Sequence, residues 1–168
     1  MPNSETFSIK PIKALIEKYI KDRAVIIDPF ANKSKYGTIT NDLNPNTGAM
    51  FHIDALEFLK MQQDGSADMI LYDPPYSMRQ ASECYKSFGK EKLSGTVTNM
   101  RYWSSCKKEC ARILKAGGVC VSCGWNSMGL GKNRGFTIVE VLLVPHGGNR
   151  NDTIVVVEVK EIKKEVKS

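Results

Sequence analysis

Short apolar runs that lead into an aspartate recur along the first half of the chain, and they restrict the folds open to it. Four segments do so: residues 24–27, 50–53 and 67–72 directly precede Asp28, Asp54 and Asp73, and residues 38–40 lead into Asn41-Asp42. Continuous apolar runs of this length are typical of strands that are buried on both faces of a parallel sheet. In such sheets ligands bind at the edge formed by the carboxyl ends of the strands. We therefore expect the four acids to converge on one ligand site.

Helical patterns separate these runs. Apolar residues recur with helical spacing over 9–21, 55–61 and 101–115, and Gly117-Gly118 follows the last of them as a stop signal. Strands that alternate with helices predict an α/β fold with a doubly wound, mostly parallel sheet.

The second half of the chain adds strands of another kind. Residues 119–123 predict a fifth buried strand. Two β-branched runs, 136–144 and 153–159, flank the loop 145–152 and predict a C-terminal antiparallel hairpin. Residues 160–168 carry mixed charges and are expected to form a solvated tail.

Size and composition favour one domain in the cytoplasm. The chain has 168 residues, 42% of them hydrophobic, which is enough for a single core. It contains no apolar run of about 18 residues, and residues 1–7 lack the apolar core of a signal peptide. Five cysteines, an odd number, indicate reduced thiols. The net charge of +6 raises the expectation of a polyanionic partner without establishing it.

The segment Asp73-Pro74-Pro75-Tyr76 is the strongest candidate for chemistry. Two consecutive prolines fix the backbone and hold Asp73 in an extended conformation. A carboxylate and a carbonyl held in this way can accept both hydrogens of an amino group, while the ring of Tyr76 stacks on the group that carries it. This is the arrangement needed to methylate the exocyclic nitrogen of a nucleobase. The alternative is an acidic turn capped by prolines, which is common at strand ends.

The cysteines suggest a zinc site only superficially. Cys106 and Cys110 are predicted on one helix, whereas Cys120 and Cys123 are predicted on opposite faces of a strand. Four sulfur atoms placed in this way cannot converge on one ion, so no metal is expected. Cys84 is expected to be a free thiol in a loop.

From residue 7 to about residue 160 the chain resembles the class I S-adenosylmethionine-dependent methyltransferases that methylate amino groups in DNA. It is most similar to the small adenine-specific enzymes of bacteriophages and prophages. Asp42 and five stretches of sequence carry the resemblance: Ser8–Leu15, Ile27–Ser34, Asp54–Leu59, Asp73–Tyr76 and Arg112–Gly118.

The resemblance implies a Rossmann-like fold, S-adenosyl-L-methionine as the cofactor, and methyl transfer to N6 of adenine in DNA. It assigns the catalytic role to Asp73, Pro74, Pro75 and Tyr76. It assigns cofactor binding to Lys10, Asp28, Pro29, Phe30, Ala31, Asn32, Asp42, Asp54 and Ala55. Within that set, Asp42 corresponds to the acid on the ribose hydroxyls.

Two departures from the family pattern leave alternatives open. The family places glycines soon after Asp-Pro-Phe, whereas here residues 31–36 precede Gly37. An inactive nucleic-acid-binding relic of the fold is therefore one alternative. No segment resembles a target-recognition domain, so sequence specificity must come from loops, from a second subunit in a homodimer, or be poor. Methylation of RNA or of cytosine N4 is another alternative, because the same motif serves those amines.

Two polar segments are candidates for contact with DNA. Residues 77–100 are predicted to form a long charged loop beside the catalytic motif, with Arg79, Lys86 and Lys90 available to phosphates. Arg150 belongs to the second candidate, the loop of the hairpin. A mobile solvated loop and a plain hairpin turn are the respective alternatives.

Overall fold

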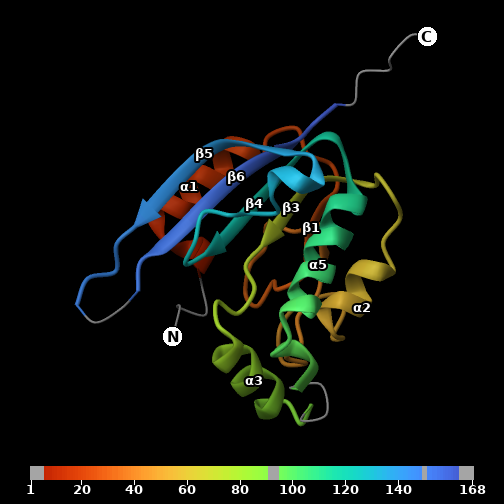
Figure 1. The fold of residues 1–168 in the computed structure, drawn as a ribbon, viewed down its shortest axis with the longest axis vertical. Helices are drawn as coiled ribbons and strands as arrows, with labels where there is room; N and C mark the ends of the chain where they lie inside the picture. The colour runs from red at the N-terminus through yellow and green to blue at the C-terminus, as the bar shows by residue number, and fades with distance from the viewer. Residues whose placement is uncertain (1–5, 91–94, 149–150, 163–168) are drawn as a thin grey trace.

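The computed structural model describes residues 6–90, 95–148 and 151–162. In this part of the chain the strands form a six-stranded sheet in the order β2-β1-β3-β4-β6-β5 (Figure 1). The strands are β1 (Ile26–Asp28), β2 (Ile39–Thr40), β3 (Ala67–Tyr72), β4 (Leu114–Gly124), β5 (Phe136–Val144) and β6 (Thr153–Lys160). The first four are parallel, and β6 runs antiparallel to both β4 and β5. The predicted α/β fold with a C-terminal antiparallel hairpin is confirmed.

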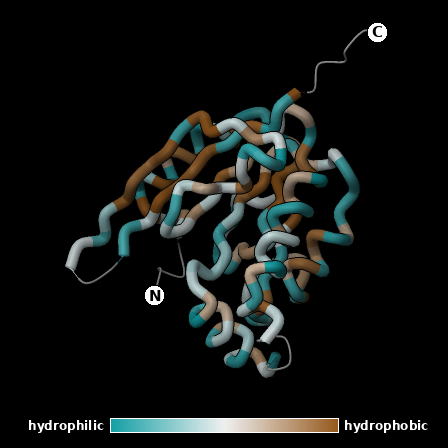
Figure 2. The backbone as a smooth tube through the Cα atoms, in the orientation of Figure 1, coloured by the Kyte–Doolittle hydropathy of each residue, from teal (hydrophilic) through white to brown (hydrophobic). Residues whose placement is uncertain are grey.

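Helices cover both faces of the sheet. The helical elements discussed below are η1 (Thr6–Ser8), α1 (Lys10–Tyr19), α2 (Ala55–Lys60), α3 (Met78–Ser87), α5 (Met100–Ile113) and η2 (Lys132–Arg134). On one face, α1 buries Ile12 and Ile16 against Met69 and Val121 of the sheet. On the other face, α2 and α5 bury Phe58 and Cys110 with Ile70 and Cys120. Residues 69–71 of β3 and 119–121 of β4 are therefore buried and apolar on both faces of the sheet, as their continuous runs predict. Figure 2 gives the hydropathy of each residue along the backbone.

The strand order reverses between β1 and β3. The chain leaves β1 for β2 on one side and later returns to place β3 on the other side, with Ile27 opposite Ile70. In doubly wound sheets a ligand crevice opens outside the carboxyl ends of the strands at such a reversal. Asp28 ends β1 and Asp73 directly follows β3, so both acids lie at this point.

The connection from β1 to β2 contains no helix over residues 29–38. It is held close to the sheet, because Ala31 N donates to Asn41 O and Thr38 N donates to Ile26 O. Gly37 is required at this close approach. A Cβ there would lie 2.8 Å from Thr40 Cγ2 and 2.9 Å from Cβ of Asp28.

The expectation of a strand over residues 50–53 is wrong. Phe51 makes a single parallel bridge with Asn41, and no ladder follows. The Asn41 side chain bonds both backbone groups of Ile53: its Oδ1 accepts from Ile53 N and its Nδ2 donates to Ile53 O. The Asn41 side chain therefore forms the pair of hydrogen bonds that the backbone of a neighbouring strand would form.

The expectation of a long loop over residues 77–100 is also wrong. Most of its described part is helical, because α3 spans Met78–Ser87 and α5 begins at Met100. Ser77 caps α3 by accepting a hydrogen bond from Gln80 N at 3.2 Å. Ala81 and Tyr85, four residues apart, form its buried side. Figure 1 shows α3 beyond the carboxyl ends of the strands rather than on a face of the sheet.

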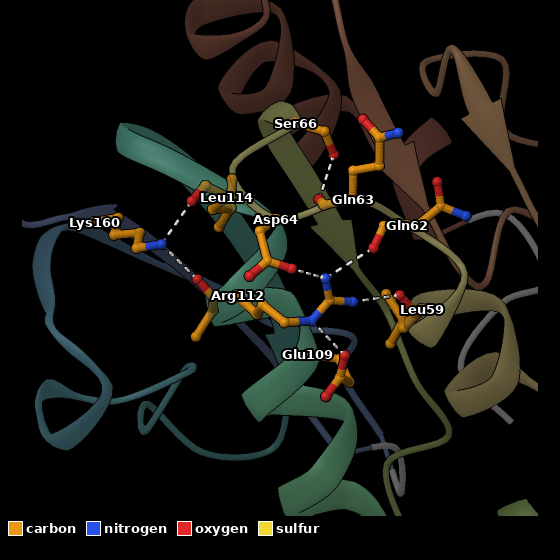
Figure 3. Close-up of polar contacts among 10 residues, drawn as sticks. Leu59, Gln62, Gln63, Asp64, Ser66, Glu109, Arg112, Leu114 and Lys160 are labelled. Atoms are coloured by element: carbon orange, nitrogen blue, oxygen red, sulfur yellow. Dashed lines mark hydrogen bonds and ion pairs between the residues drawn. The ribbon is translucent and has the colours of Figure 1, made fainter.

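The junction of α5 and β4 lies earlier than the glycines suggest. The helix ends at Ile113, and the strand begins at Leu114, so Gly117-Gly118 fall inside β4 where its register with β3 shifts. Figure 3 shows the contacts of Arg112, which lies in the last turn of α5. Arg112 donates to the carbonyl oxygens of Leu59 and Gln62 and also bonds Asp64.

Lys160 does not belong to a solvated tail. It is the last residue of β6, and its Nζ donates at 2.6 Å to the carbonyl oxygens of both Ala111 and Leu114 (Figure 3). A cation on the last carbonyl groups of a helix satisfies them and interacts favourably with the helix dipole. The rest of the predicted tail from residue 163 lies outside the described residues.

Candidate active site

A cavity of about 820 Å³ lies at the carboxyl ends of β1, β2 and β3. Its walls come from η1, the β1–β2 connection, the segment after β2, the Asp73–Tyr76 motif and α3. The predicted site residues that line it are Pro29, Phe30, Ala31, Asn32, Asp42, Ala55, Asp73, Pro74, Pro75 and Tyr76. Ten of the predicted residues, from four separate stretches of sequence, thus surround one space.

Asp73 and Tyr76 are joined by a short hydrogen bond. The Tyr76 hydroxyl donates to Asp73 Oδ1 at 2.6 Å, and Tyr76 N donates to Gln80 Oε1 at 2.9 Å. Burial raises the pKa of Asp73 to about 6, although the bond from Tyr76 opposes this rise. The carboxyl group is therefore poised to change its charge close to neutral pH.

Asp28 lies behind the cavity wall rather than on it. Its side chain is fully buried; Oδ1 accepts from Phe30 N at 3.1 Å. Burial, with a smaller contribution from the charges of Asp73 and Asp42, raises the pKa of Asp28 to about 8. At neutral pH the protonated form of Asp28 is therefore favoured, because a buried charge beside Asp73 is unfavourable.

Asp42 joins two segments of the cavity wall by accepting hydrogen bonds from the backbone of each. Its Oδ2 accepts from Asn32 N and its Oδ1 accepts from Asn44 N, each at 2.8 Å. The side chain is half-buried and lines the cavity, so a ligand hydroxyl can reach it. Asn32 itself has a φ of +46°, which asparagine tolerates better than most residues.

Asp54 is placed differently from its expected role on the cofactor. It caps α2 through Oδ1, which accepts from the backbone N–H groups of Leu56 and Glu57. Its Oδ2 accepts from the hydroxyl groups of Tyr85 and Tyr102, at 2.7 and 2.8 Å. Asp54 therefore ties α2 to α3 and α5, and it is Ala55 that lines the cavity.

The predicted basic residues do not line the cavity. Lys10 is exposed in the first turn of α1, and Lys13, one turn later, contributes to the wall instead. Arg79 pairs with Glu83 on the exposed side of α3. Lys86 and Lys90 are exposed near the end of that helix, and Arg150 lies outside the described residues.

Several residues of the site are not predicted from the sequence. Phe7 lines the cavity from η1, and Gln80 lines it from α3. The signal for α3 was available, since Ser77 is a good helix cap and Ala81 and Tyr85 are four residues apart. Trp125, which packs against Tyr76, follows β4 with no local motif to indicate its role.

Four of the five cysteines are buried among apolar side chains, whereas Cys84 is a half-buried free thiol that lies on α3 and not in the predicted loop. Cys106 and Cys110 lie on the buried side of α5, while Cys120 and Cys123 belong to core clusters on opposite faces of the sheet. Among the described residues no group of three or more histidine, cysteine or acidic side chains could hold a metal ion. In the same part of the chain, no helix is both long and apolar enough to cross a membrane.

No family model and no curated protein sequence matches the chain, but solved structures resemble it. A 1,6-didemethyltoxoflavin-N1-methyltransferase from Burkholderia thailandensis, solved with S-adenosylhomocysteine, has a TM-score of 0.63 at 13% identity, over 91% of this chain and 78% of that one. An S-adenosylmethionine-dependent methyltransferase from Archaeoglobus fulgidus has a TM-score of 0.61 at 11% identity, over 94% and 97%. The N-methyltransferase NodS from Bradyrhizobium japonicum, also solved with S-adenosylhomocysteine, has a TM-score of 0.61 at 9% identity, over 95% and 90%. The chain therefore has the Rossmann-like fold of S-adenosylmethionine-dependent methyltransferases.

Proposed function

We propose that the protein transfers a methyl group from S-adenosyl-L-methionine to the exocyclic N6 of adenine in DNA. The observation that carries the proposal is the position of Asp73-Pro74-Pro75-Tyr76, which follows β3 at the reversal of strand order and lines the cavity. A rigid carboxylate, carbonyl and aromatic ring are brought together at the place where this fold binds ligands.

The opposite walls of the cavity suit the cofactor. Asp42 is positioned to accept hydrogen bonds from ribose hydroxyl groups, while Ile53 and Ala55 offer apolar contacts to an adenine ring. The β1–β2 connection brings the backbone of Phe30 and Ala31 to the same space. S-adenosylmethionine, when bound, supplies an electrophilic methyl group on a positively charged sulfur atom. The carboxyl groups of Asp42 and Asp73, which line the cavity, favour such a cation.

Asp73 and Pro74 act on the acceptor amine. The lone pair of adenine N6 is delocalised into the ring and is a poor nucleophile. Hydrogen bonds to the Asp73 carboxylate and the Pro74 carbonyl oxygen draw the nitrogen towards tetrahedral geometry and stabilise the positive charge that develops on it. Holding the two reactants in position supplies much of the remaining rate.

Tyr76 supplies the stacking surface. A base inside duplex DNA cannot reach a cavity of this kind, so it must be flipped out of the stack. In the structure the hydroxyl of Tyr76 already occupies Asp73 Oδ1. The amino group therefore binds at Oδ2 or replaces the hydroxyl at Oδ1.

Mass spectrometry of nucleosides tests the proposal. DNA and RNA from cells that express the wild type or the Asp73→Ala variant are digested and compared. N6-methyladenine in DNA that depends on Asp73 is the expected result. Methylation found only at cytosine N4 or only in RNA would change the proposed substrate but keep the proposed chemistry of the amino group. Binding of cofactor and DNA without any methylated base would instead identify an inactive relic of the fold.

A further inference from the structure

Glu158 is a buried acid that the proposed reaction does not use. It lies within β6 with none of its surface exposed. A buried carboxylate is unfavourable unless hydrogen bonds replace its hydration. Two backbone donors do so: Leu130 N at 2.6 Å from Oε2 and Gly131 N at 3.0 Å from Oε1. Both belong to the loop between β4 and β5, so Glu158 holds that loop against the sheet.

The turn that Glu158 holds is shaped for this contact. Gly129 has a φ of +52°, and a Cβ at this position would lie 2.2 Å from Glu158 Oε2. No other residue fits without displacing the carboxylate. Lys107 Nζ donates to Gly129 O at 2.6 Å, and Arg134 donates to Leu130 O at 2.8 Å. Side chains from β6, α5 and η2 therefore fix the same turn.

The loop begins at Trp125, which reaches the candidate active site. Its ring meets the ring of Tyr76 edge to face, with centroids 5.8 Å apart and planes at 74°. Trp125 is 38% exposed and is not among the described residues that line the cavity. It therefore supports Tyr76 from outside the cavity, while the hydroxyl of Tyr76 reaches Asp73 from within.

We propose that Trp125 and Glu158 are positioning residues for the methyl acceptor: Trp125 sets the plane of the Tyr76 ring, and Glu158 holds the loop that carries Trp125. This inference rests on the proposed function, because it gives Tyr76 the acceptor base to stack on. The prolines fix the backbone before Tyr76 but not its side-chain torsions, which are set by contacts of the ring. An edge-to-face neighbour on a rigid loop restricts those torsions before the acceptor arrives.

Kinetics provide the first test. Trp125→Ala should lower kcat/KM for the nucleic-acid acceptor about tenfold and leave the affinity for S-adenosylhomocysteine unchanged. Trp125→Phe, which keeps an aromatic edge, should recover most of the loss. Equal kcat/KM for Trp125→Ala and the wild type would overturn the proposal, as would an equal loss in the alanine and phenylalanine variants.

Fluorescence provides a second test that needs no activity. The chain has two tryptophans, so Trp103→Phe leaves Trp125 as the sole emitter. In that background, Glu158→Gln should increase the quenching of Trp125 by acrylamide, because it replaces one of the two side-chain oxygens that accept from the backbone N–H groups of the loop and so releases the loop. The matched control is Glu161→Gln, an exposed acid three residues away, which should leave quenching unchanged.

The two tests separate the possible failures. Unchanged quenching in a folded Glu158→Gln variant overturns the role of Glu158. If the Glu158→Gln variant does not fold, Tyr76→Ala in the same Trp103→Phe background tests whether the two rings are in contact. The substitution should increase the quenching of Trp125 by acrylamide, and unchanged quenching would overturn the contact. A wild type that methylates no nucleic acid refutes the proposed function, whereas the quenching results still decide whether the loop positions Tyr76.

Discussion

The hydroxyl of Tyr76 donates a hydrogen bond of 2.6 Å to Oδ1 of Asp73. The bond joins the first and last residues of the motif across the two prolines. It gives Tyr76 a second role beside the proposed stacking, because the same side chain also lowers the pKa of the carboxyl group that the proposed reaction requires. The consequences for Asp73, Tyr76 and the neighbouring acids can be measured separately.

Asp73→Ala should abolish methyl transfer while leaving the fold and cofactor binding nearly intact. The side chain lies at the cavity wall, so its loss removes an acceptor rather than core packing. Loss of one such stabilising group lowers kcat by about 10²–10³-fold. Methyl incorporation into DNA, calorimetry with S-adenosylhomocysteine and thermal melting check the three parts. If the variant unfolds instead, the motif is a structural turn.

Tyr76→Phe should shift the pH dependence of the reaction. Burial raises the pKa of Asp73 to about 6, and the hydrogen bond from Tyr76 lowers it. Removing that bond raises the pKa further. Since the ionised carboxylate is the acceptor, kcat/KM of the wild type should fall as the pH drops through about 6. In Tyr76→Phe this fall should occur at a higher pH, and an acid limb at the same pH would contradict the role of the hydroxyl.

Tyr76→Ala should lose more activity than Tyr76→Phe at pH 8. Above the pKa of Asp73 the phenylalanine variant keeps both the carboxylate and the stacking ring, whereas alanine removes the ring. A stacked aromatic contributes about 1–3 kcal/mol per base. The order of kcat/KM should therefore be wild type, then Phe, then Ala. Equal values for Phe and Ala would assign the effect to the hydroxyl alone.

Asp28→Asn should flatten the pH dependence of stability. The pKa of Asp28 is about 8 in the fold, where burial raises it, against an ordinary value near 4. The native state thus binds the proton more tightly, so the free energy of unfolding falls as pH rises from about 4 to about 8. Asparagine cannot ionise, and the melting temperature of the variant should decline less over pH 6–8. Parallel melting curves for the two proteins would contradict this.

Asp42→Ala should weaken cofactor binding about tenfold. The loss of ribose hydrogen bonds, each contributing about 0.5–1.5 kcal/mol, sets this scale. The substitution also removes the carboxylate that accepts from Asn32 N and Asn44 N, so Asp42→Asn, which keeps one acceptor oxygen, is the matched variant. Calorimetry with S-adenosylhomocysteine should rank the affinities wild type, Asn, Ala. Unchanged affinity in both variants would remove Asp42 from the cofactor site.

Replacing Arg79, Lys86 and Lys90 together by alanine should reduce the salt dependence of DNA binding. Each phosphate contact contributes about 0.9 to the slope of log K against log salt concentration. The control replaces three exposed lysines elsewhere on the surface: Lys21, Lys60 and Lys108. Binding curves at several salt concentrations provide the slopes. An equal slope in the wild type and the first variant would place the contact surface elsewhere.

Local patterns in the sequence were sufficient for the architecture and for much of the cavity wall. Continuous apolar runs predict β1, β3 and β4 because strands buried on both faces need apolar residues at every position. The Asp73–Tyr76 motif and the β1–β2 connection were predicted to meet because parallel strands end at one edge of a sheet. Weak runs were less informative: residues 50–53 lack the ladder that their pattern suggested, because the Asn41 side chain bonds Ile53 instead.

Only the tertiary structure decided which groups form hydrogen bonds with the acidic residues and which side chains support the Asp73–Tyr76 motif. Asp54 bonds Tyr85 and Tyr102, which lie 31 and 48 residues away, and no local pattern encodes those distances. The contact of Trp125 with Tyr76 and the hold of Glu158 on the loop arise in the same way, from strands that are adjacent in the sheet but distant in sequence. Periodicity reports which face of an element is buried, whereas a side-chain hydrogen bond or ring contact depends on how whole elements pack, and only the folded chain specifies that.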